Sequence, residues 1–206
     1  MRTKIICILD RSPSMSSIID EAISGFNKFI DEQKKIEGSD KDIMKIIQFE
    51  TSCETVFNKT IDCVEHFNNE TYKPQGFGTA LYDAVGLTID EELDFLAESP
   101  KNRVDKTLCV ILTDGEENSS TKYHRDLIKR KIEEMEKEFS WNFIFLAANQ
   151  DAVFTANTIG ISSGSAMNFN ADGEGVRQVY QQMSKATSYY RTTNKEDYSD
   201  IMKDSE

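Results

Sequence analysis

Short and almost wholly apolar runs alternate along this chain with longer segments whose apolar residues recur at helical spacing. The runs that predict strands cover residues 4–9, 43–49, 53–58, 107–112, 141–148 and 166–169. Strands that are apolar on both faces are typical of a parallel sheet with helices packed on both sides. The alternation therefore predicts an α/β fold, a Rossmann-like and mostly parallel central sheet flanked by helices on both faces.

Helical spacing is clearest in four segments, which begin near residues 16, 81, 127 and 176. Ser17 and Asp20 predict a capping box at the start of the first helix. Residues 50–52 read as a tight turn between two predicted strands. We therefore expect a hairpin, with one of its strands running antiparallel near the edge of the sheet.

The chain has 206 residues, a length that suits one domain able to bury roughly 70% of its unfolded surface. We expect this domain to cover residues 1–190. Residues 191–206 are mostly polar and acidic, and they predict a flexible tail.

Acidic residues outnumber basic ones by 36 to 24, which gives a net charge of −12. Such a surface repels phosphate backbones and anionic membranes, so the composition argues against nucleic acid or a membrane as partner. No apolar stretch approaches the ~20 residues needed to cross a bilayer. The run that ends at Leu9 is also too short for a signal-peptide core, so we expect a cytoplasmic protein. The four cysteines are scattered, as is typical of free thiols.

Side chains with hydroxyl or carboxyl oxygens gather where the predicted elements begin or end. Asp10, Ser12 and Ser14 occupy alternate positions directly after the first predicted strand. Thr79 precedes a predicted helix, and Asp114 follows the strand at 107–112. In open α/β sheets the functional crevice lies beyond the carboxyl ends of the strands. We therefore expect the five side chains to converge there.

These five residues offer hard oxygen ligands with only two formal negative charges. That chemistry suits a six-coordinate Mg²⁺ or Mn²⁺ that retains water and an open position. Each piece also has an ordinary structural explanation, as a helix cap or as an Asp-Gly turn. Their joint occurrence, in this order and on these elements, is what predicts a metal site.

Other kinds of site fit the sequence less well. Gly76 and Gly78 lack the third glycine of a dinucleotide fingerprint, and no phosphate-binding loop of the Gly-x₄-Gly-Lys-Ser/Thr type occurs. An aspartyl phosphatase needs a second acid where Ser12 stands, and a receiver domain needs a lysine where Asn149 stands. No nucleophile–base pair is visible, so we expect no enzymatic activity.

Residues around the predicted site have two interpretations each. Glu116 and Glu117 either tune the charge of the site or belong to a solvated loop. Residues 149–151 either border the same crevice or begin a helix. His66 and His124 are expected to be structural or surface residues.

The D-x-S-x-S pattern at 10–14, with "GTALYDAV" from Gly78 and "ILTDGEEN" from Ile111, resembles the von Willebrand factor type A (vWA) domain and its metal-ion-dependent adhesion site. The order of predicted elements from residue 4 to about 190 also fits, so the resemblance spans nearly the whole chain. It implies that the metal is contacted by the hydroxyls of Ser12, Ser14 and Thr79. Asp10 and Asp114 would then act directly or through water.

One position departs from the family pattern. Pro13 stands where members of the family usually have glycine, and proline fixes φ and removes a backbone donor. The residue either stiffens the loop or weakens a ligand geometry that needs glycine.

The chain looks most like the stand-alone prokaryotic and phage proteins of this type. The resemblance implies a metal-dependent protein-binding module with a scaffold or assembly role, whose protein partner supplies an Asp or Glu to the open metal position. Two alternatives stay open: a metal-dependent phosphohydrolase that uses the same site, and a structural domain whose site is vestigial because of Pro13. The sequence carries no indication of the oligomeric state.

Overall fold

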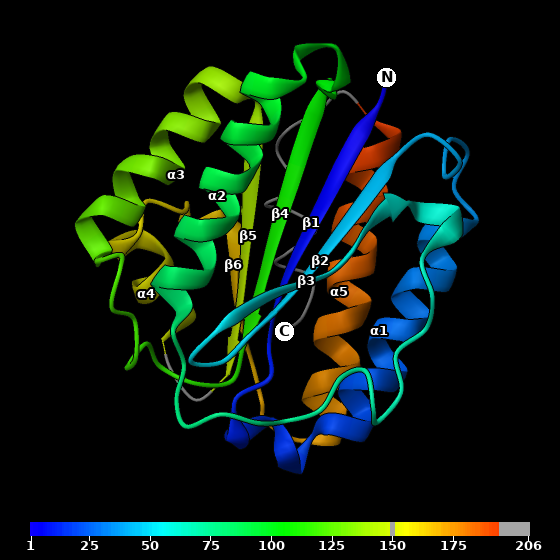
Figure 1. The fold of residues 1–206 in the computed structure, drawn as a ribbon. Helices are drawn as coiled ribbons and strands as arrows, with labels where there is room; N and C mark the ends of the chain where they lie inside the picture. Colours follow the sequence, from blue (N-terminus) through cyan, green and yellow to red (C-terminus); the bar gives the residue numbers. More distant parts are fainter. Residues whose placement is uncertain (149–150, 194–206) are drawn as a thin grey trace.

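A computed structural model describes residues 1–148 and 151–193 of the chain. Six strands form one sheet in the order β3-β2-β1-β4-β5-β6 (Figure 1). Its strands are β1 Thr3–Asp10, β2 Ile43–Phe49, β3 Cys53–Thr60, β4 Lys106–Thr113, β5 Trp141–Ala148 and β6 Ala166–Phe169. The α-helices are α1 Ile19–Lys34, α2 Leu81–Glu98, α3 Arg125–Phe139, α4 Ala152–Thr158 and α5 Gly173–Thr192.

The pairing of the strands matches the predicted fold class. β2, β1, β4, β5 and β6 run parallel to one another, and only β3 pairs antiparallel, with β2. β1 and β4 are buried along their whole length because helices cover both of their faces. β3 lies at the edge and is largely exposed or half-buried. The predicted hairpin with one antiparallel edge strand is therefore confirmed.

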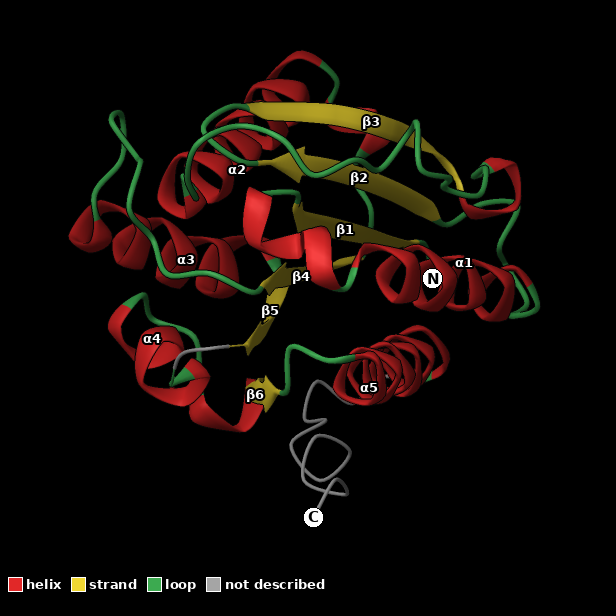
Figure 2. Cartoon of the chain, turned by 90° about the horizontal axis from the view of Figure 1, so that it is seen from below, coloured by secondary structure: helices red, strands yellow, loops and turns green. Residues whose placement is uncertain are grey.

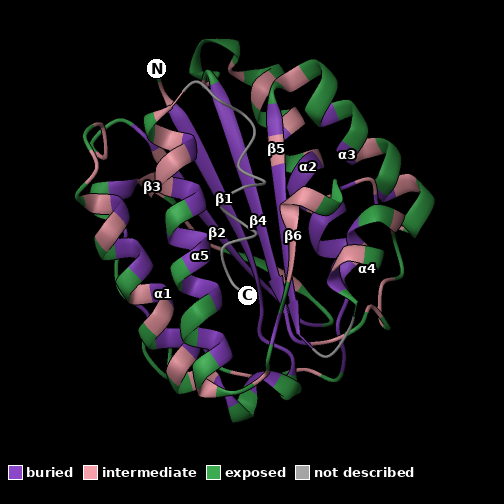
Figure 3. Cartoon of the chain, turned by 180° about the vertical axis from the view of Figure 1, so that it is seen from behind, coloured by how far each residue is buried: buried purple, intermediate pink, exposed green. Residues whose placement is uncertain are grey.

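The helices form a layer on each side of the sheet (Figure 2). Helices α1 and α5 cover one side, where Phe26 and Tyr180 pack in the core. Helices α2, α3 and α4 cover the other, where Leu81, Ile128 and Phe143 pack. The central strands are buried between the layers, and many exposed residues lie on the outer sides of the helices (Figure 3). Among the described residues, no helix is both long and apolar enough to cross a membrane.

The predicted capping box at Ser17 and Asp20 is wrong. Residues Pro13–Ser17 instead form a short 3-10 helix, and Ile18 precedes α1 without any side-chain cap. The hydroxyl of Ser17 points back toward the carbonyl of Ser14, at 3.5 Å, so it does not cap α1.

The end of the described chain bears on the predicted tail. Helix α5 continues through Arg191, whose Nε donates to Asp42 Oδ2 at 2.9 Å. The rest of the predicted tail, from residue 194 to 206, lies outside the described residues.

Candidate metal centre

Strands β1 and β4 are parallel neighbours, so the segments that follow them leave the sheet at the same edge. β1 ends at Asp10, and β4 ends directly before Asp114. Ser14 Oγ donates a hydrogen bond of 2.6 Å to Asp114 Oδ1, and Ser12 Oγ lies 3.0 Å from Ser14 Oγ. The structure thus brings Ser12, Ser14 and Asp114 together in one hydrogen-bonded group.

Asp10 is fully buried at the base of this group. Its Oδ1 accepts a hydrogen bond of 2.7 Å from the main-chain N–H of Ser12, and its Oδ2 accepts one of 2.6 Å from the hydroxyl of Thr113. Burial raises the pKa of Asp10 to about 6, and these hydrogen bonds oppose the rise only in part. The donors are neutral, and Asp10 forms no ion pair with any described residue. A buried acid with this environment favours the approach of an external cation.

Thr79 joins the group from the loop before α2. Its side chain is buried, and a Cβ atom built on Gly115 would lie 3.1 Å from Thr79 Oγ1 and 3.8 Å from Ser14 Oγ. The two hydroxyls therefore flank the same glycine. Two main-chain groups of Thr79 are fixed by Asn118, because Thr79 N donates to Asn118 Oδ1 at 2.9 Å and Thr79 O accepts from Asn118 N at 3.0 Å.

Pro13 occupies the first position of the 3-10 helix that presents Ser14. Ser12 is the N-cap residue, and its carbonyl accepts from Met15 N at 3.1 Å. The N–H that proline lacks has no intrahelical partner at this position, and the fixed φ of proline suits a helix start. Pro13 and Ser14 are both exposed. The proline is therefore compatible with the turn that carries Ser14 to the surface.

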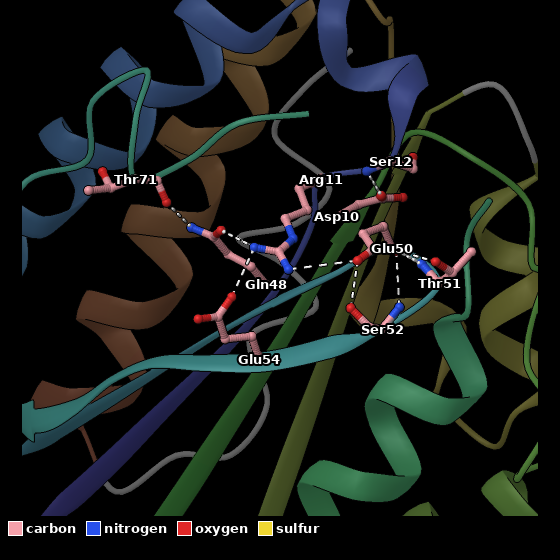
Figure 4. Close-up of polar contacts among 9 residues, drawn as sticks. All are labelled: Asp10, Arg11, Ser12, Gln48, Glu50, Thr51, Ser52, Glu54 and Thr71. Carbon is pink, nitrogen blue, oxygen red and sulfur yellow. Dashed lines mark hydrogen bonds and ion pairs between the residues drawn. The ribbon is translucent and has the colours of Figure 1, made fainter. Parts of the chain in front are cut away.

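The charge of Arg11 is directed away from the carboxylate of Asp10, toward the hairpin of β2 and β3 (Figure 4). Arg11 Nη1 donates to Gln48 Oε1 at 3.3 Å and to Glu54 Oε2 at 3.1 Å. Arg11 Nη2 lies 3.7 Å from Glu50 Oε1. This guanidinium therefore compensates acids of the hairpin, which leaves the group around Asp10 negative.

Glu50 fixes the loop that carries Thr79. Its carboxylate accepts hydrogen bonds from the main-chain and hydroxyl groups of the two residues that follow it (Figure 4). Burial acts to raise the pKa of Glu50, but these hydrogen bonds outweigh burial and lower the pKa. The main-chain oxygen of Glu50 accepts from Ala80 N at 2.6 Å. Gly76 lies against the Glu50 carboxylate with φ of +80°, and a Cβ atom there would collide with it.

Four residues that hold the group in place were missed by the sequence analysis. Thr113 and Asn118 belong to the quoted segment around Asp114, so their polar side chains were an available signal. Glu50 and Tyr72 have no such signal. Tyr72 is fully buried in the irregular segment before α2, and its hydroxyl donates to the main-chain oxygen of Asp10 at 2.5 Å.

The acids that flank Asp114 have different surroundings. Glu117 accepts hydrogen bonds from the main-chain N–H groups of Ser119 and Ser120, at 2.9 and 2.8 Å, and from Tyr82 N at 2.9 Å. Glu117 therefore organises its own loop and joins it to α2. Glu116 is exposed.

The remaining candidates lie elsewhere or outside the described residues. Asp151 begins α4 as its N-cap and accepts from Phe154 N at 2.9 Å, whereas residues 149–150 are not among those described. His66 is exposed and pairs with Asp31 at 2.8 Å. His124 caps α3 through its ring nitrogen.

The donor set fits a small, hard divalent cation. It combines two carboxyl groups with three hydroxyls, the ligand types preferred by Mg²⁺ and Mn²⁺. Burial raises the pKa of both Asp10 and Asp114, and a cation against them would favour their ionised forms. Within the described ranges, no three His, Cys, Asp or Glu side chains gather closely enough to hold a metal by themselves. A cation at this edge of the sheet would therefore need the hydroxyls of Ser12, Ser14 and Thr79.

Comparison of the chain with protein-family models and with curated proteins finds no match. Solved structures do match. Proximal thread matrix protein 1 from the mussel byssus has a TM-score of 0.65 at 14% identity, over 88% of this chain and 46% of that one. The ArnB paralog VWA2 from Sulfolobus acidocaldarius has a TM-score of 0.58 at 17% identity, over 89% and 44%.

A second structure of the mussel protein, described as having a zinc-occupied MIDAS motif, has a TM-score of 0.63 at 15% identity, over 88% of this chain and 46% of that one. MIDAS denotes the metal-ion-dependent adhesion site. A von Willebrand factor type A protein from Catenulispora acidiphila has a TM-score of 0.57 at 12% identity, over 91% of this chain and 42% of that one. The chain spans just under half the length of these proteins. The fold of this chain is therefore that of a vWA-type domain.

Proposed function

We propose that this protein is a divalent-cation-dependent protein-binding module, with Mg²⁺ or Mn²⁺ held by Asp10, Ser12, Ser14, Thr79 and Asp114. The observation that carries the proposal is the convergence of these side chains around Ser14, which links Ser12 to Asp114 through its hydroxyl. The bound cation would supply positive charge to which an acidic group of a partner is attracted.

The burial of the donor set supports a role in binding at the surface. Asp10, Ser12 and Asp114 are at most 2% exposed, whereas Ser14 is exposed. The group is thus closed on the protein side and open to solvent at Ser14. With two acids against a divalent cation, the site would be close to neutral, so it would not repel a partner's Asp or Glu.

Each residue has a separate task in this proposal. Asp10 and Asp114 would supply the negative charge that holds the cation. Ser12, Ser14 and Thr79 would contribute neutral oxygens, which leave the cation able to attract a further carboxylate. Asn118 and Glu50 keep the Thr79 loop against the site through main-chain hydrogen bonds.

The vWA-type fold supports a scaffold or assembly role, in which a protein partner is recognised through its Asp or Glu. A cytoplasmic location stays part of this proposal. Cys7, Cys53, Cys63 and Cys109 are all free thiols, as expected in a reducing compartment.

Calorimetric titration with Mg²⁺ and with Mn²⁺ tests the site. We expect one cation per chain and loss of binding in Asp10→Asn, which keeps the shape of the side chain but removes its charge. Ser14→Ala should weaken binding, and Ser16→Ala serves as its matched control because Ser16 is an exposed serine of the same 3-10 helix. Unchanged affinity in both Asp10→Asn and Ser14→Ala would refute the assignment.

The partner is then sought with the same variants. Proteins retained by the wild-type chain in Mg²⁺ and released by chelator should not be retained by Asp10→Asn. Retention that is independent of both the chelator and Asp10 would contradict metal-dependent binding, even if the cation itself binds.

A further inference from the structure

The amino ends of the parallel strands carry a cavity of about 300 Å³, at the opposite end of the sheet from the metal centre. Its floor contains Ile43, Lys4, Thr107 and Trp141, which are cross-strand neighbours across β2, β1, β4 and β5. Its walls come from the last turns of α2, the end of α3, and residues 102–104. The helices on this side thus leave these first residues of the strands partly uncovered.

The apolar part of the cavity is aromatic. Phe95 of α2, Phe139 of α3 and Trp141 of β5 all line it. Trp141 is held in place by Phe143, with ring centroids 5.7 Å apart. Phe95 is 40% exposed, so its ring is accessible from solvent at one wall of the cavity. Such rings favour an aromatic ligand, since ring edges and faces attract one another.

The charged part of the cavity is positive. Arg2, Lys4 and Arg103 line it together with one acid, Glu92, in a chain whose net charge is −12. Lys4 Nζ donates to Glu92 at 2.6 Å with both side chains buried, so these two charges neutralise each other in the floor.

The two arginines supply the excess charge. Arg2 Nε donates to a neutral main-chain oxygen, that of Lys41, at 3.0 Å. The Arg103 guanidinium lies 5.7 Å from the centre of the Phe139 ring. The nearby carboxylate of Asp105 is used by the main-chain N–H of Arg2 and does not line the cavity. The positive charge of Arg103 therefore lies beside the aromatic wall, and that of Arg2 lies at the side of the cavity near Lys41.

We propose that this cavity binds a small aromatic carboxylate. The ring of the ligand would lie among Phe95, Phe139 and Trp141, and its carboxylate would pair with the guanidinium groups of Arg103 and Arg2. Guanidinium binds carboxylate through two parallel hydrogen bonds, which gives geometric selectivity for such an anion. A volume of about 300 Å³ is at the lower end for ligand sites, so a ligand with one ring fits best.

Trp141 is the only tryptophan of the chain, so its fluorescence reports on this cavity alone. The probe is phenylpropanoate, with excitation at wavelengths that its phenyl ring does not absorb. We expect a saturable change in Trp141 emission. Phenylpropanamide, the neutral analogue, should bind about tenfold more weakly, and hexanoate, which lacks the ring, should also bind more weakly.

Two arginine variants locate the anion. Arg103→Gln should weaken phenylpropanoate binding about tenfold, and because Arg103 is exposed the fold should be kept. Arg125→Gln is the matched control, an exposed arginine that does not line this cavity, and it should leave the affinity unchanged. Asp10→Asn should also leave it unchanged, because the metal centre is at the other end of the sheet.

The proposal is overturned if neither fluorescence nor calorimetry shows saturable binding of phenylpropanoate. Equal affinity for the amide, or unchanged affinity in Arg103→Gln, would overturn the carboxylate assignment. Equal affinity for hexanoate would overturn the aromatic one.

Discussion

At the amino ends of the strands, Lys4 and Lys45 of the sheet share Glu92 of α2, with Nζ–O distances of 2.6 and 3.2 Å. At the carboxyl ends, Asp10 is as deeply buried but accepts its hydrogen bonds from neutral donors, the Ser12 N–H and the Thr113 hydroxyl. Both ends of the same parallel sheet therefore bury charge, but Asp10, unlike Lys4, Lys45 and Glu92, forms no ion pair with any described residue.

The difference teaches where an external ion fits. A buried acid beside a buried base needs nothing further, and another charge at that point would be repelled by one of the two. A buried acid with neutral donors is stabilised by an incoming cation. The carboxyl ends also carry the loops, whose hydroxyls can reach a common point, whereas the charges of Lys4, Lys45 and Glu92 stand on regular strands and a helix.

The largest effect is expected when the buried ion pairs at the amino ends are broken. Glu92→Gln leaves Lys4 and Lys45 buried without that acid, and should lower the free energy of unfolding by about 3–5 kcal/mol. Glu91→Gln is the control, since Glu91 also pairs with Lys45 but is 57% exposed, and it should cost at most ~1 kcal/mol. Urea denaturation measures both. Equal effects would show that the buried network is not the stabilising element.

At the carboxyl ends, the corresponding stabilising acid is Asp83, which is held by main-chain groups rather than by a base. Its carboxylate accepts from the N–H groups of residues 121–123 at 2.8 to 2.9 Å. Asp83→Ala leaves these donors without their acceptor and should cost about 1–3 kcal/mol. Hydrogen exchange of residues 121–123 should accelerate. Unchanged protection there would contradict this role.

Asp83 also gives the carboxyl ends a pH dependence. Burial acts to raise the pKa of Asp83, but the hydrogen bonds from Thr121, Tyr123 and Lys122 outweigh it and lower the pKa. Because the folded pKa lies below the unfolded one, the stabilisation is fully present above the unfolded pKa and is lost as pH falls through the folded value. When the free energy of unfolding is measured at decreasing pH, Asp83→Asn should show a smaller pH dependence than the wild type. Asp126→Asn, at a highly exposed acid, should keep it.

A smaller effect is expected at the loop that brings Thr79 to the site. Gly76→Ala places a Cβ atom at a residue with φ of +80°, against the Glu50 carboxylate. The left-handed conformation alone costs a non-glycine residue about 1–2 kcal/mol. We expect that loss in stability and a weaker cation affinity in calorimetry. Gly38→Ala is the control, with φ of +92° and an ordinary contact of 3.8 Å between its new Cβ and Asp42 Oδ2, and it should cost stability without changing cation affinity.

The fold and the convergence of the site could be predicted for a simple physical reason. Strands that are apolar on both faces indicate a parallel sheet, and parallel strands end at one edge. The residues after 4–9 and 107–112 were therefore expected to meet, and Ser14 and Asp114 are hydrogen bonded. Thr79 was placed by the same reasoning, because its loop leads into a helix that packs on the same sheet.

The residues that hold the site in place could not be predicted, because their contacts depend on the tertiary packing of irregular segments. Tyr72 precedes α2 in a stretch without regular periodicity, and nothing in the sequence indicates that its hydroxyl reaches the Asp10 carbonyl. Glu50 reads as an ordinary turn residue, although its main-chain oxygen holds Ala80. The cavity at the amino ends could not be predicted either, since its lining comes from seven separate helices and strands and from residues 102–104.

The smallest expected effect compares two prolines that begin 3-10 helices, Pro13 at the carboxyl ends and Pro100 at the end of α2. Pro13→Gly should keep the fold and change cation affinity by less than tenfold, or about 1.4 kcal/mol, because neither Ser12 nor Ser14 depends on a donor at residue 13. Loss of the ring makes the unfolded chain more flexible, so stability should fall by up to about 1 kcal/mol. Pro100→Gly should show the same stability loss with no change in cation affinity. Complete loss of cation binding in Pro13→Gly alone would show that the ring itself shapes the loop that presents Ser14.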